Sequence, residues 1–333
     1  MVLILSEEND TSTNLVLDHF IHNKKLVKRH NGENQKQFGY ISLFINDLSF
    51  SIKLEQGSIK LTDNKSNKEL DITSVWFRRP YSGVNDFNIS LNSKDSINSE
   101  SAYRSILNNY KIFKDYLFNN IVKKSLGSYN ITGLNKIKTL SLAKGVGLTI
   151  PKTIITNNRE EVVRFLSVSS NGLICKAIHE AFHDKSYLNE GFWISNKTTA
   201  IYDINDVPDS FGPSIFQENI FKEYEIRTFY LNGEFFSSCI FSQNNEKTKI
   251  DFRNYDEKKP NRMVPYKLPK EIQNQIKKLM ELSKLNTGSI DFIKNKKGQY
   301  IFLEINPVGQ FDFVSKSCNF NIDKRIYNYL SNE

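Results

Sequence analysis

The segment QYIFLEINPVGQF, residues 299–311, ends an apolar strand with two side chains that carry oxygen ligands, Glu304 and Asn306. Because side chains alternate along a strand, residues two apart point to the same face. A turn at 297–298 is expected to fold the preceding strand back, which brings Asp291 alongside them. Unpaired burial of such groups in an apolar segment is costly. The three residues therefore predict a Mg²⁺ site completed by substrate phosphates; a solvated strand face without metal is the alternative.

Composition points to a folded protein with an anionic partner. The chain has 333 residues, 39% of them hydrophobic, with 24 Phe and 15 Tyr, which is enough for a sizeable core and too long for one ordinary domain. Its net charge of +8 suits a nucleotide, a nucleic acid or an acidic peptide, and does not choose among them. A merely solubilising surface explains the charge equally well.

The cysteines and the N-terminus indicate a cytoplasmic protein. Cys175, Cys239 and Cys318 are far apart and form no C-x-x-C pair, so we expect buried free thiols in a reducing compartment. The N-terminus has too few apolar residues for a signal sequence. No apolar run approaches the roughly 18 residues of a membrane span, so no membrane association is expected.

Apolar periodicity and turn signals predict an α/β (α+β) chain in three parts, 1–125, 126–212 and 213–333. The first part combines strands with a helix capped by Thr11, Ser12 or Thr13 and a long amphipathic helix. The expected strands lie near 2–5, 40–45, 48–54, 58–62, 72–80, 152–156, 172–178, 198–204 and 214–220. Two hairpins are expected, 225–242 with a turn at Asn232-Gly233 and 289–306 with a turn around Lys297-Gly298. The expected helices lie near 11–21, 100–121, 134–144, 159–167, 270–284 and 321–330.

Two lysines are candidates for binding phosphate. Neither a G-x-x-x-x-G-K-[ST] loop nor a G-x-G-x-x-G turn after a strand occurs, so P-loop and Rossmann nucleotide sites are disfavoured. Lys136 lies at the start of an expected helix, and Lys176 lies inside the apolar strand LICKAI. A lysine in such a strand either extends to solvent at an edge or faces an anion.

The segment FQENIFKEYEIR, residues 216–227, adds further candidates for a nucleotide site. Its turn offers backbone groups to an adenine near Glu218 and Ile220, and Glu225 is a suitable acceptor for a ribose. Arg227 shares a strand face with Glu225 and is suited to stabilise a transferring phosphoryl group. An ordinary charged hairpin at the surface is the alternative.

Taken together, these motifs resemble the ATP-grasp superfamily. The pattern NK…L…A…GL.IPKT..T (135–156), the strand lysine, the QEN…E.R run and the terminal D…E-x-N occur in that family's order. The resemblance implies an ATP-grasp fold, with ATP held between two antiparallel sheets of a central and a C-terminal subdomain that follow an N-terminal α/β domain. It implies Lys136 and Lys176 on ATP phosphates, Glu218 and Ile220 at adenine, Glu225 at ribose, and Asp291, Glu304 and Asn306 on Mg²⁺. The family's glycines after the strand lysine are missing here, where only Gly191 occurs.

A narrower resemblance is to the microviridin-type, or graspetide, peptide maturases, especially the grasp-with-spasm subgroup. It rests on SVWFRRP (74–80), SQ (242–243), DFR (251–253) and the ending NPVGQF followed by a Cys-Asn pair. The resemblance implies an ATP-dependent macrocyclase that phosphorylates Glu or Asp side chains of a ribosomal precursor peptide and closes ω-esters with Ser or Thr, or ω-amides with Lys. It also implies a homodimer, and a precursor with a leader and a core rich in acids and hydroxyls.

No nucleophilic triad is evident, and phosphoryl transfer needs none, because positioning and charge neutralisation suffice. Arg227, Arg253 and Lys176 are the expected catalytic residues. Arg78 and Arg79 serve either the precursor or the N-terminal domain's structure. His179 and His183 lack a third zinc ligand. The alternatives are another ATP-grasp carboxylate–amine ligase, and a nucleotide- or nucleic-acid-binding module, which we disfavour because the charges are scattered.

Overall fold

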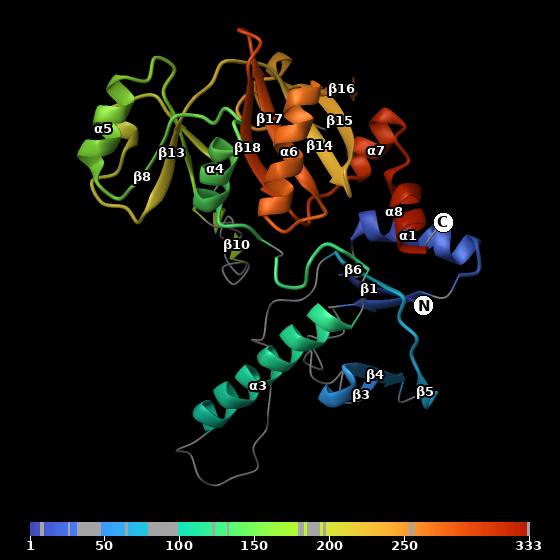
Figure 1. Ribbon diagram of the computed structural model, residues 1–333. Coiled ribbons are helices and arrows are strands. Elements are labelled where there is room, and N and C mark those ends of the chain that lie inside the picture. The colour runs from blue at the N-terminus through green and yellow to red at the C-terminus, as the bar shows by residue number, and fades with distance from the viewer. Residues whose placement is uncertain are drawn as a thin grey trace. The chain divides into compact units, whose positions relative to one another are not determined.

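A computed structural model shows two compact units, Met1–Thr132 with Asn321–Glu333 (unit 1) and Gly133–Phe320 (unit 2) (Figure 1). None of the described helices is both long and apolar enough to cross a bilayer. The structure describes residues 1–6, 10–25, 27–31, 48–63, 66–78, 99–121, 124–131, 133–178, 183–184, 194–195, 198–252, 256 and 258–331.

Unit 1 is built on a parallel sheet with the strand order β2-β1-β6-β7. Its central strands β1 (Val2–Ser6) and β6 (Ser74–Phe77) are buried along their whole length, as is typical of a parallel sheet covered on both faces. Helices α1 (Thr11–His22) and α8 (Ile322–Ser331) pack together, and α8 also contacts β6. The other elements are β2 (Val27–Asn31), β7 (Ser125–Leu126), α3 (Ser99–Asn120) and the antiparallel sheet β3 (Leu48–Lys53), β4 (Ser58–Asp63) and β5 (Lys68–Glu69).

Unit 2 contains a small antiparallel sheet with the order β12-β9-β13-β8. Asn135 and Asn158 immediately precede helices α4 and α5, and the side chain of each accepts a backbone N–H as an N-cap. Val162, Leu173 and Phe216 lie in the core of this region. The elements are α4 (Lys136–Gly145), β8 (Thr153–Thr156), α5 (Arg159–Ser167), β9 (Leu173–Lys176), β12 (Thr199–Ile201) and β13 (Ser214–Glu218).

A five-stranded antiparallel sheet forms the rest of unit 2, in the order β16-β15-β14-β17-β18. Asn232 and Gly233, both with positive φ, form the tight turn expected between β14 and β15. Helix α6 lies over this sheet, next to α4, which contacts β18 (Figure 1). The elements are β14 (Lys222–Leu231), β15 (Glu234–Phe241), β16 (Arg262–Tyr266), α6 (Lys270–Leu282), β17 (Thr287–Asn295), β18 (Tyr300–Asn306) and α7 (Asp312–Cys318).

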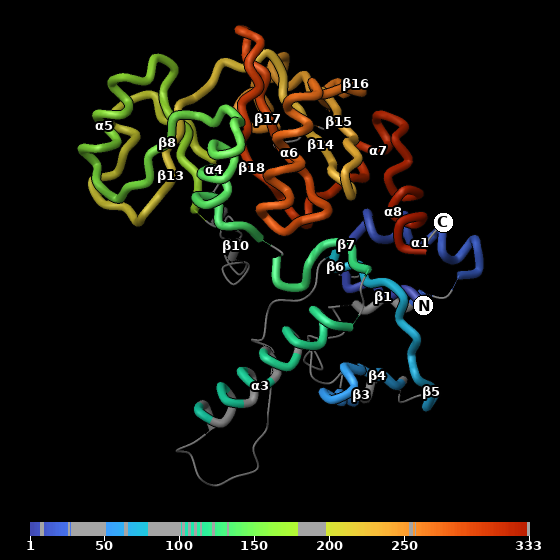
Figure 2. Tube along the Cα trace, viewed as in Figure 1, coloured from blue at the N-terminus to red at the C-terminus, as the bar shows by residue number. Residues whose placement is uncertain are grey.

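Most predicted elements are present where the sequence placed them. Figure 2 shows the described elements in chain order by colour. The cap of α1 is a correction: Asp10 precedes the helix, and Thr11 is already its first residue. Helix α7 and strand β16 were not predicted. The expected strand at 40–45 lies outside the described residues. The three predicted parts, 1–125, 126–212 and 213–333, stay a prediction, and in the structure the closing helix packs within unit 1 and β13 completes the small sheet.

Candidate functional site

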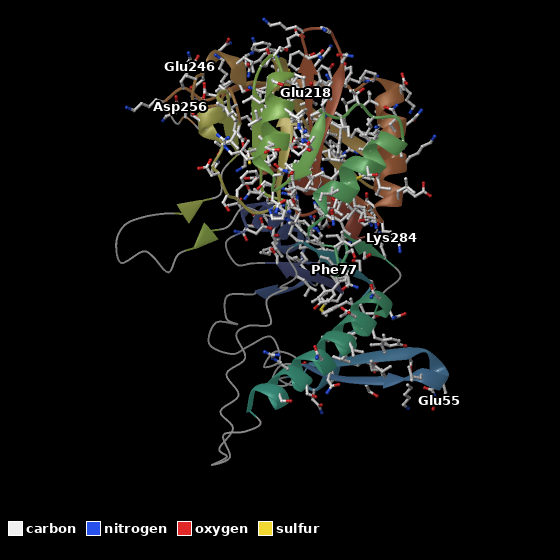
Figure 3. All side chains as sticks on the ribbon, turned by 90° about the vertical axis from the view of Figure 1, so that its left-hand side faces the viewer. Glu55, Phe77, Glu218, Glu246, Asp256 and Lys284 are labelled. Atoms are coloured by element: carbon white, nitrogen blue, oxygen red, sulfur yellow. The ribbon has the colours of Figure 1, made fainter. Side chains whose placement is uncertain are left out.

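One pocket in unit 2 gathers residues from both of its sheets. Pro151 and Ile174 come from the small-sheet region, and Ile293 and Leu303 come from the large sheet. Figure 3 labels Glu218, which lies at the end of β13. Of the site residues predicted from sequence, the structure brings six to this pocket: Lys176, Glu218, Ile220, Glu225, Asp291 and Glu304.

The two carboxylates predicted to hold metal, Asp291 and Glu304, are direct partners across β17 and β18. The register shifts immediately beside them, because Phe292 pairs with Phe302 and leaves Leu303 as an extra residue. In a regular strand Glu304 would share the face of Phe302, which is fully buried in the core. The bulge places Leu303 and Glu304 on the pocket face together, a common use of bulges near functional sites.

Arg227 lies behind these acids and binds one of them. It pairs with Asp291 across β14 and β17, and its Nη1 donates to Asp291 Oδ2 at 2.7 Å. Both side chains are more than nine-tenths buried. Because the pair is desolvated, removal of the arginine would leave a charge in a costly environment. Arg227 therefore holds Asp291 in place and offsets part of the negative charge at the pocket.

The NPVGQF segment after β18 packs directly onto this ion pair. Val308 N–H donates to Asn306 Oδ1 at 3.1 Å, which turns the chain back over β17. Gly309 then passes so close that a Cβ there would lie 2.5 Å from Ser289 Cβ and 3.1 Å from Arg227 Nη2. Glycine is required by this close approach rather than by its backbone angle. The motif thus shields the Arg227–Asp291 pair.

Glu225 is held in a buried ion pair that the sequence did not reveal. Lys222 Nζ donates to Glu225 Oε1 at 2.7 Å, and Ser242 Oγ donates to the same oxygen at 2.7 Å. Burial raises the pKa of Glu225, and the charge of Lys222 and these two hydrogen bonds offset part of that rise. All three residues are buried, and the acid and the lysine line the pocket.

The connection between β15 and β16 forms one wall of the pocket through Ile250, Asp251 and Phe252. Within it, Gln243 Nε2 donates to the Lys249 carbonyl at 3.0 Å, and Thr248 Oγ1 donates to the Ser242 carbonyl at 3.0 Å. Figure 3 labels Glu246 and Asp256 in this connection. The SQ motif and the first two residues of the DFR motif therefore belong to the same connection, in which Asp251 and Phe252 line the pocket.

Glu218 and Ile220 border the pocket from the small sheet. Two hydrogen bonds join Glu218 to Lys152, the residue before β8. The Glu218 N–H donates to the Lys152 carbonyl at 3.0 Å, and the Lys152 N–H donates to Glu218 Oε1 at 3.0 Å. Among the described residues, neither main-chain polar group of Ile220 takes part in a hydrogen bond. A donor and an acceptor two residues after the end of β13 suit the edge of a purine ring.

The two candidate phosphate-binding lysines lie close together in the chain's fold. Lys176 is half-buried and lines the pocket from the end of β9. Lys136, in the first turn of α4, points its Nζ at the carbonyl of Ala177, 3.4 Å away. Lys136 itself does not line the pocket, but it lies beside the residue that follows Lys176.

The remaining predicted residues differ in their placement. Asn306 pairs with Ser289 on the face of Asp291, but it is exposed and its Oδ1 already accepts the Val308 N–H. Arg253, Arg79 and His179 lie outside the described residues. Arg78 is buried in unit 1, where its Nε donates to Asp10 Oδ2 at 2.9 Å. This ion pair gives Arg78 a structural role in its own unit.

The donor set fits Mg²⁺ held jointly with a nucleotide. Within the described residues, no cluster of three or more His, Cys, Asp or Glu side chains is suited to a metal. In this part of the chain, protein side chains alone therefore do not form a complete metal site. Two facing carboxylates at the rim of a pocket lined by Lys176 match the usual Mg²⁺ arrangement, in which phosphates and water complete the shell.

Comparison with known proteins shows similarity in structure alone. No family model matches the chain. No curated protein matches its sequence. Among solved structures, the macrocyclase MdnC bound with precursor peptide MdnA from Microcystis aeruginosa MRC has 26% identity and a TM-score of 0.73, covering 100% of this chain and 99% of its own.

Two further structures agree over nearly the whole chain. The Chryseobacterium gregarium RiPP-associated ATP-grasp ligase, in complex with ADP and a leader and core peptide, has 23% identity and a TM-score of 0.73 over 99% of this chain and 94% of its own. The ATP-grasp ligase PsnB, complexed with a phosphomimetic minimal precursor variant, Mg and ADP, has 16% identity and a TM-score of 0.66 over 99% and 97%. The chain has the ATP-grasp fold, and the predicted resemblance is confirmed.

Proposed function

We propose that the protein is an ATP-dependent macrocyclase that acts on a ribosomal precursor peptide with a leader and a core rich in acids and hydroxyls. The observation that carries the proposal is the convergence of six motif residues, separated by as many as 128 positions (176 to 304), on one pocket. The structural likeness to MdnC over the full chain supports the peptide substrate, since that protein was solved with its precursor.

The reaction proceeds in two transfers. An oxygen of a Glu or Asp side chain of the peptide attacks the γ-phosphorus of ATP, and the bond to ADP breaks. A Ser or Thr hydroxyl, or a Lys amine, then attacks the acyl carbon and loses its proton, and inorganic phosphate leaves. Each ring closed removes one water from the peptide and converts one ATP to ADP and phosphate. Phosphoryl transfer of this kind depends on positioning and charge neutralisation.

The pocket residues divide these tasks. Ile220 presents its main chain to adenine beside Glu218, and Glu225 accepts from the ribose. Lys176, with Lys136 next to it, binds phosphate oxygens. Asp291 and Glu304 are the proposed Mg²⁺ ligands, with Asn306 as a third. Mg²⁺, when bound, neutralises charge on the phosphates.

Different observations support Arg227 and Arg253 as catalytic residues. Arg227 already binds Asp291 at 2.7 Å, so it orients a proposed metal ligand besides being a candidate for the acyl phosphate. Arg253 follows the pocket residues Asp251 and Phe252 in sequence, which supports a role at the acceptor side. We also propose that the enzyme acts in the cytoplasm, as a homodimer.

Co-expression with the precursor encoded by a neighbouring short reading frame tests the proposal. Mass spectrometry should show loss of one water per ring, and Glu304→Ala/Asn306→Ala should abolish it. Tandem fragmentation then assigns each ring as ester or amide.

Rival functions give different results in the same system. ADP release without loss of water from the peptide indicates another carboxylate–amine ligase, such as one that adds glutamate or joins two amino acids. Absence of MgADP binding by calorimetry, combined with retention on DNA across a salt gradient, indicates a nucleic-acid-binding module.

A further inference from the structure

Lys222 reaches the pocket only because its strand contains a bulge. Tyr224 pairs with Lys294 and Lys222 pairs with Asn295, so Glu223 is an extra residue between them. In a regular strand, residues three apart face opposite sides of the sheet. Here the bulge turns Lys222 to the face of Glu225, which makes their 2.7 Å ion pair possible.

The ammonium of Lys222 binds two parts of the pocket at once. Besides Glu225 Oε1 it donates to the carbonyl of Ile250 at 2.9 Å. Glu225 belongs to the sheet floor, and Ile250 begins the wall continued by Asp251 and Phe252. Among the hydrogen bonds of the described residues, those of the Lys222 side chain connect Glu225 on the sheet to Ile250 in the pocket wall.

The start of the connection that leads to this wall is also bonded to Glu225. Ser242 Oγ donates to Glu225 Oε1, and the Ser242 carbonyl accepts from Thr248 Oγ1. The connection 242–252 is therefore anchored to Glu225 at its start by Ser242 and at its end by Lys222. Loss of the first anchor leaves the second in place, so the two are separable by mutation.

The burial of Lys222 makes this arrangement specific. Its side chain is 6% exposed and that of Glu225 is 8% exposed. Asp251 adds negative charge nearby, which raises the pKa of Glu225 further. A buried lysine is stable when its charge is paired and hydrogen-bonded, and Lys222 has the Glu225 carboxylate and the Ile250 carbonyl as partners.

We propose that Lys222 is a positioning residue for nucleotide binding: it fixes the Glu225 carboxylate and the Ile250–Phe252 wall in the arrangement that receives the nucleoside. This inference rests on the proposed function, because it takes the pocket as the ATP site. Lys222 acts through Glu225 and the wall, and needs no contact with the nucleotide. Partners that orient metal ligands are commonly worth about 10- to 100-fold in metal affinity or activity, and we expect an effect of that size from a residue that orients Glu225.

The test compares Lys222→Met with the matched control Lys294→Met. Lys294 precedes Asn295, the β17 partner of Lys222. It pairs with Tyr224, faces the opposite side of the sheet, and its Nζ lies 5.2 Å from the ring centroid of Tyr300. Hydrogen exchange of residues 242–252 is measured without nucleotide, and MgADP affinity is measured by calorimetry. We expect faster exchange at 250–252 and about 10- to 100-fold weaker ADP binding for Lys222→Met only.

Kinetics separate positioning from general damage. Lys222→Met should raise the KM for ATP while kcat at saturating ATP stays within about threefold. The variant weakens ATP binding equally in the ground state and the transition state, so the rate of the chemical step is nearly unchanged. Ser242→Ala should weaken ADP binding while leaving exchange at 250–252 unchanged. Equal exchange and affinity in Lys222→Met and Lys294→Met would overturn the inference.

A second pair of variants covers failure to fold. Lys222→Met/Glu225→Gln removes both charges of the buried pair, so it is expected to fold stably. Glu225→Gln keeps the Lys222 bond to the Ile250 carbonyl but removes the carboxylate that matches the ammonium, so it is expected to be the less stable of the two. Exchange at 250–252 should rise, and ADP affinity fall further, from the single to the double variant; no difference contradicts the inference. If the wild type itself does not bind MgADP, the proposed function fails, while the exchange comparison still reports on the wall.

Discussion

Asp291 and Glu304 face each other across β17 and β18 with the bulged Leu303 next to them. The bulge is the local cause of the site's geometry, because it keeps Phe302 in the core while it turns the following acid to the pocket. The half-buried Glu304 therefore lines the pocket only two residues after the fully buried Phe302. Lys222 depends on a second bulge in the same sheet, at Glu223. Both functional side chains owe their direction to a break in alternation.

Glu304→Gln should remove Mg²⁺-dependent nucleotide binding and activity. The amide keeps the shape of the side chain but removes the charge that attracts a hard cation. We expect kcat/KM to fall on the order of 100-fold or more, in the range seen when one electrostatic contact is lost from an active site. Peptide dehydration assays at several Mg²⁺ concentrations measure this. Unchanged activity at low Mg²⁺ would refute the metal assignment.

Arg227→Met should destabilise the protein by about 3–5 kcal/mol, because it leaves Asp291 charged and buried without its 2.7 Å partner. Urea unfolding measures the loss. Arg227→Met/Asp291→Asn is the control, since it removes the stranded charge and should recover much of the stability. A single variant as stable as the wild type would show that Asp291 finds another partner.

The sequence predicts more of this site than of its support. Glu304, Asp291 and Lys176 stand out because polar groups interrupt apolar strands, and that signal depends on local alternation. Lys222 gives no such signal: by alternation it belongs to the face opposite Glu225, and the bulge that reverses it depends on pairing with β17. The hydrogen bonds of Ser242 to Glu225 and of Lys222 to the Ile250 carbonyl join residues far apart in the chain. Local sequence patterns therefore cannot predict them.

The fold shows the same division. Helix α5, which has an Asn cap, was predicted with its observed bounds, whereas α4 was predicted at 134–144 and begins two residues later. Helix α7 and strand β16 were missed, because α7 is a single short helix and the strand contains Pro265. A proline argues against a strand when only the local sequence is considered, because it cannot donate a backbone hydrogen bond. Here Pro265 lies on the edge strand β16, where only one side of the strand pairs with a neighbour.

Gly309→Ala should impair activity by displacing Arg227. The new Cβ would lie 2.5 Å from Ser289 Cβ and 3.1 Å from Arg227 Nη2, so the NPVGQF segment or the arginine must move. Ser289→Gly in the same chain removes the closest atom and should restore part of the activity. Gly145→Ala is the control, because its Cβ meets nothing within 4 Å at the end of α4 and should be neutral or stabilising. Dehydration rates and thermal unfolding compare these three variants with the wild type.

Cys239 should make stability fall at alkaline pH. Burial raises the pKa of its thiol to about 12, above the ordinary value of 9.0. Below pH 9 both folded and unfolded chains carry the proton, so the stabilisation is complete. Between 9 and about 12 the unfolded chain loses its proton first, and stability declines. Cys239→Ala should flatten this decline in urea titrations, and Cys239 should resist alkylation at pH 8 in the native state. Rapid native alkylation would contradict its burial.

Arg78→Met separates a structural role from contact with the precursor. Arg78 and Asp10 are buried in unit 1, joined at 2.9 Å, and Thr13 Oγ1 also donates to Asp10 Oδ2 at 2.6 Å. Loss of the arginine strands the carboxylate, so unfolding free energy should fall by about 3–5 kcal/mol, and Arg78→Met/Asp10→Asn should recover much of it. MgADP affinity should stay within about twofold, because the pocket residues all belong to unit 2. A variant with wild-type stability and ADP binding that no longer modifies the peptide would instead place Arg78 in precursor recognition, since only a contact with the substrate would then be missing.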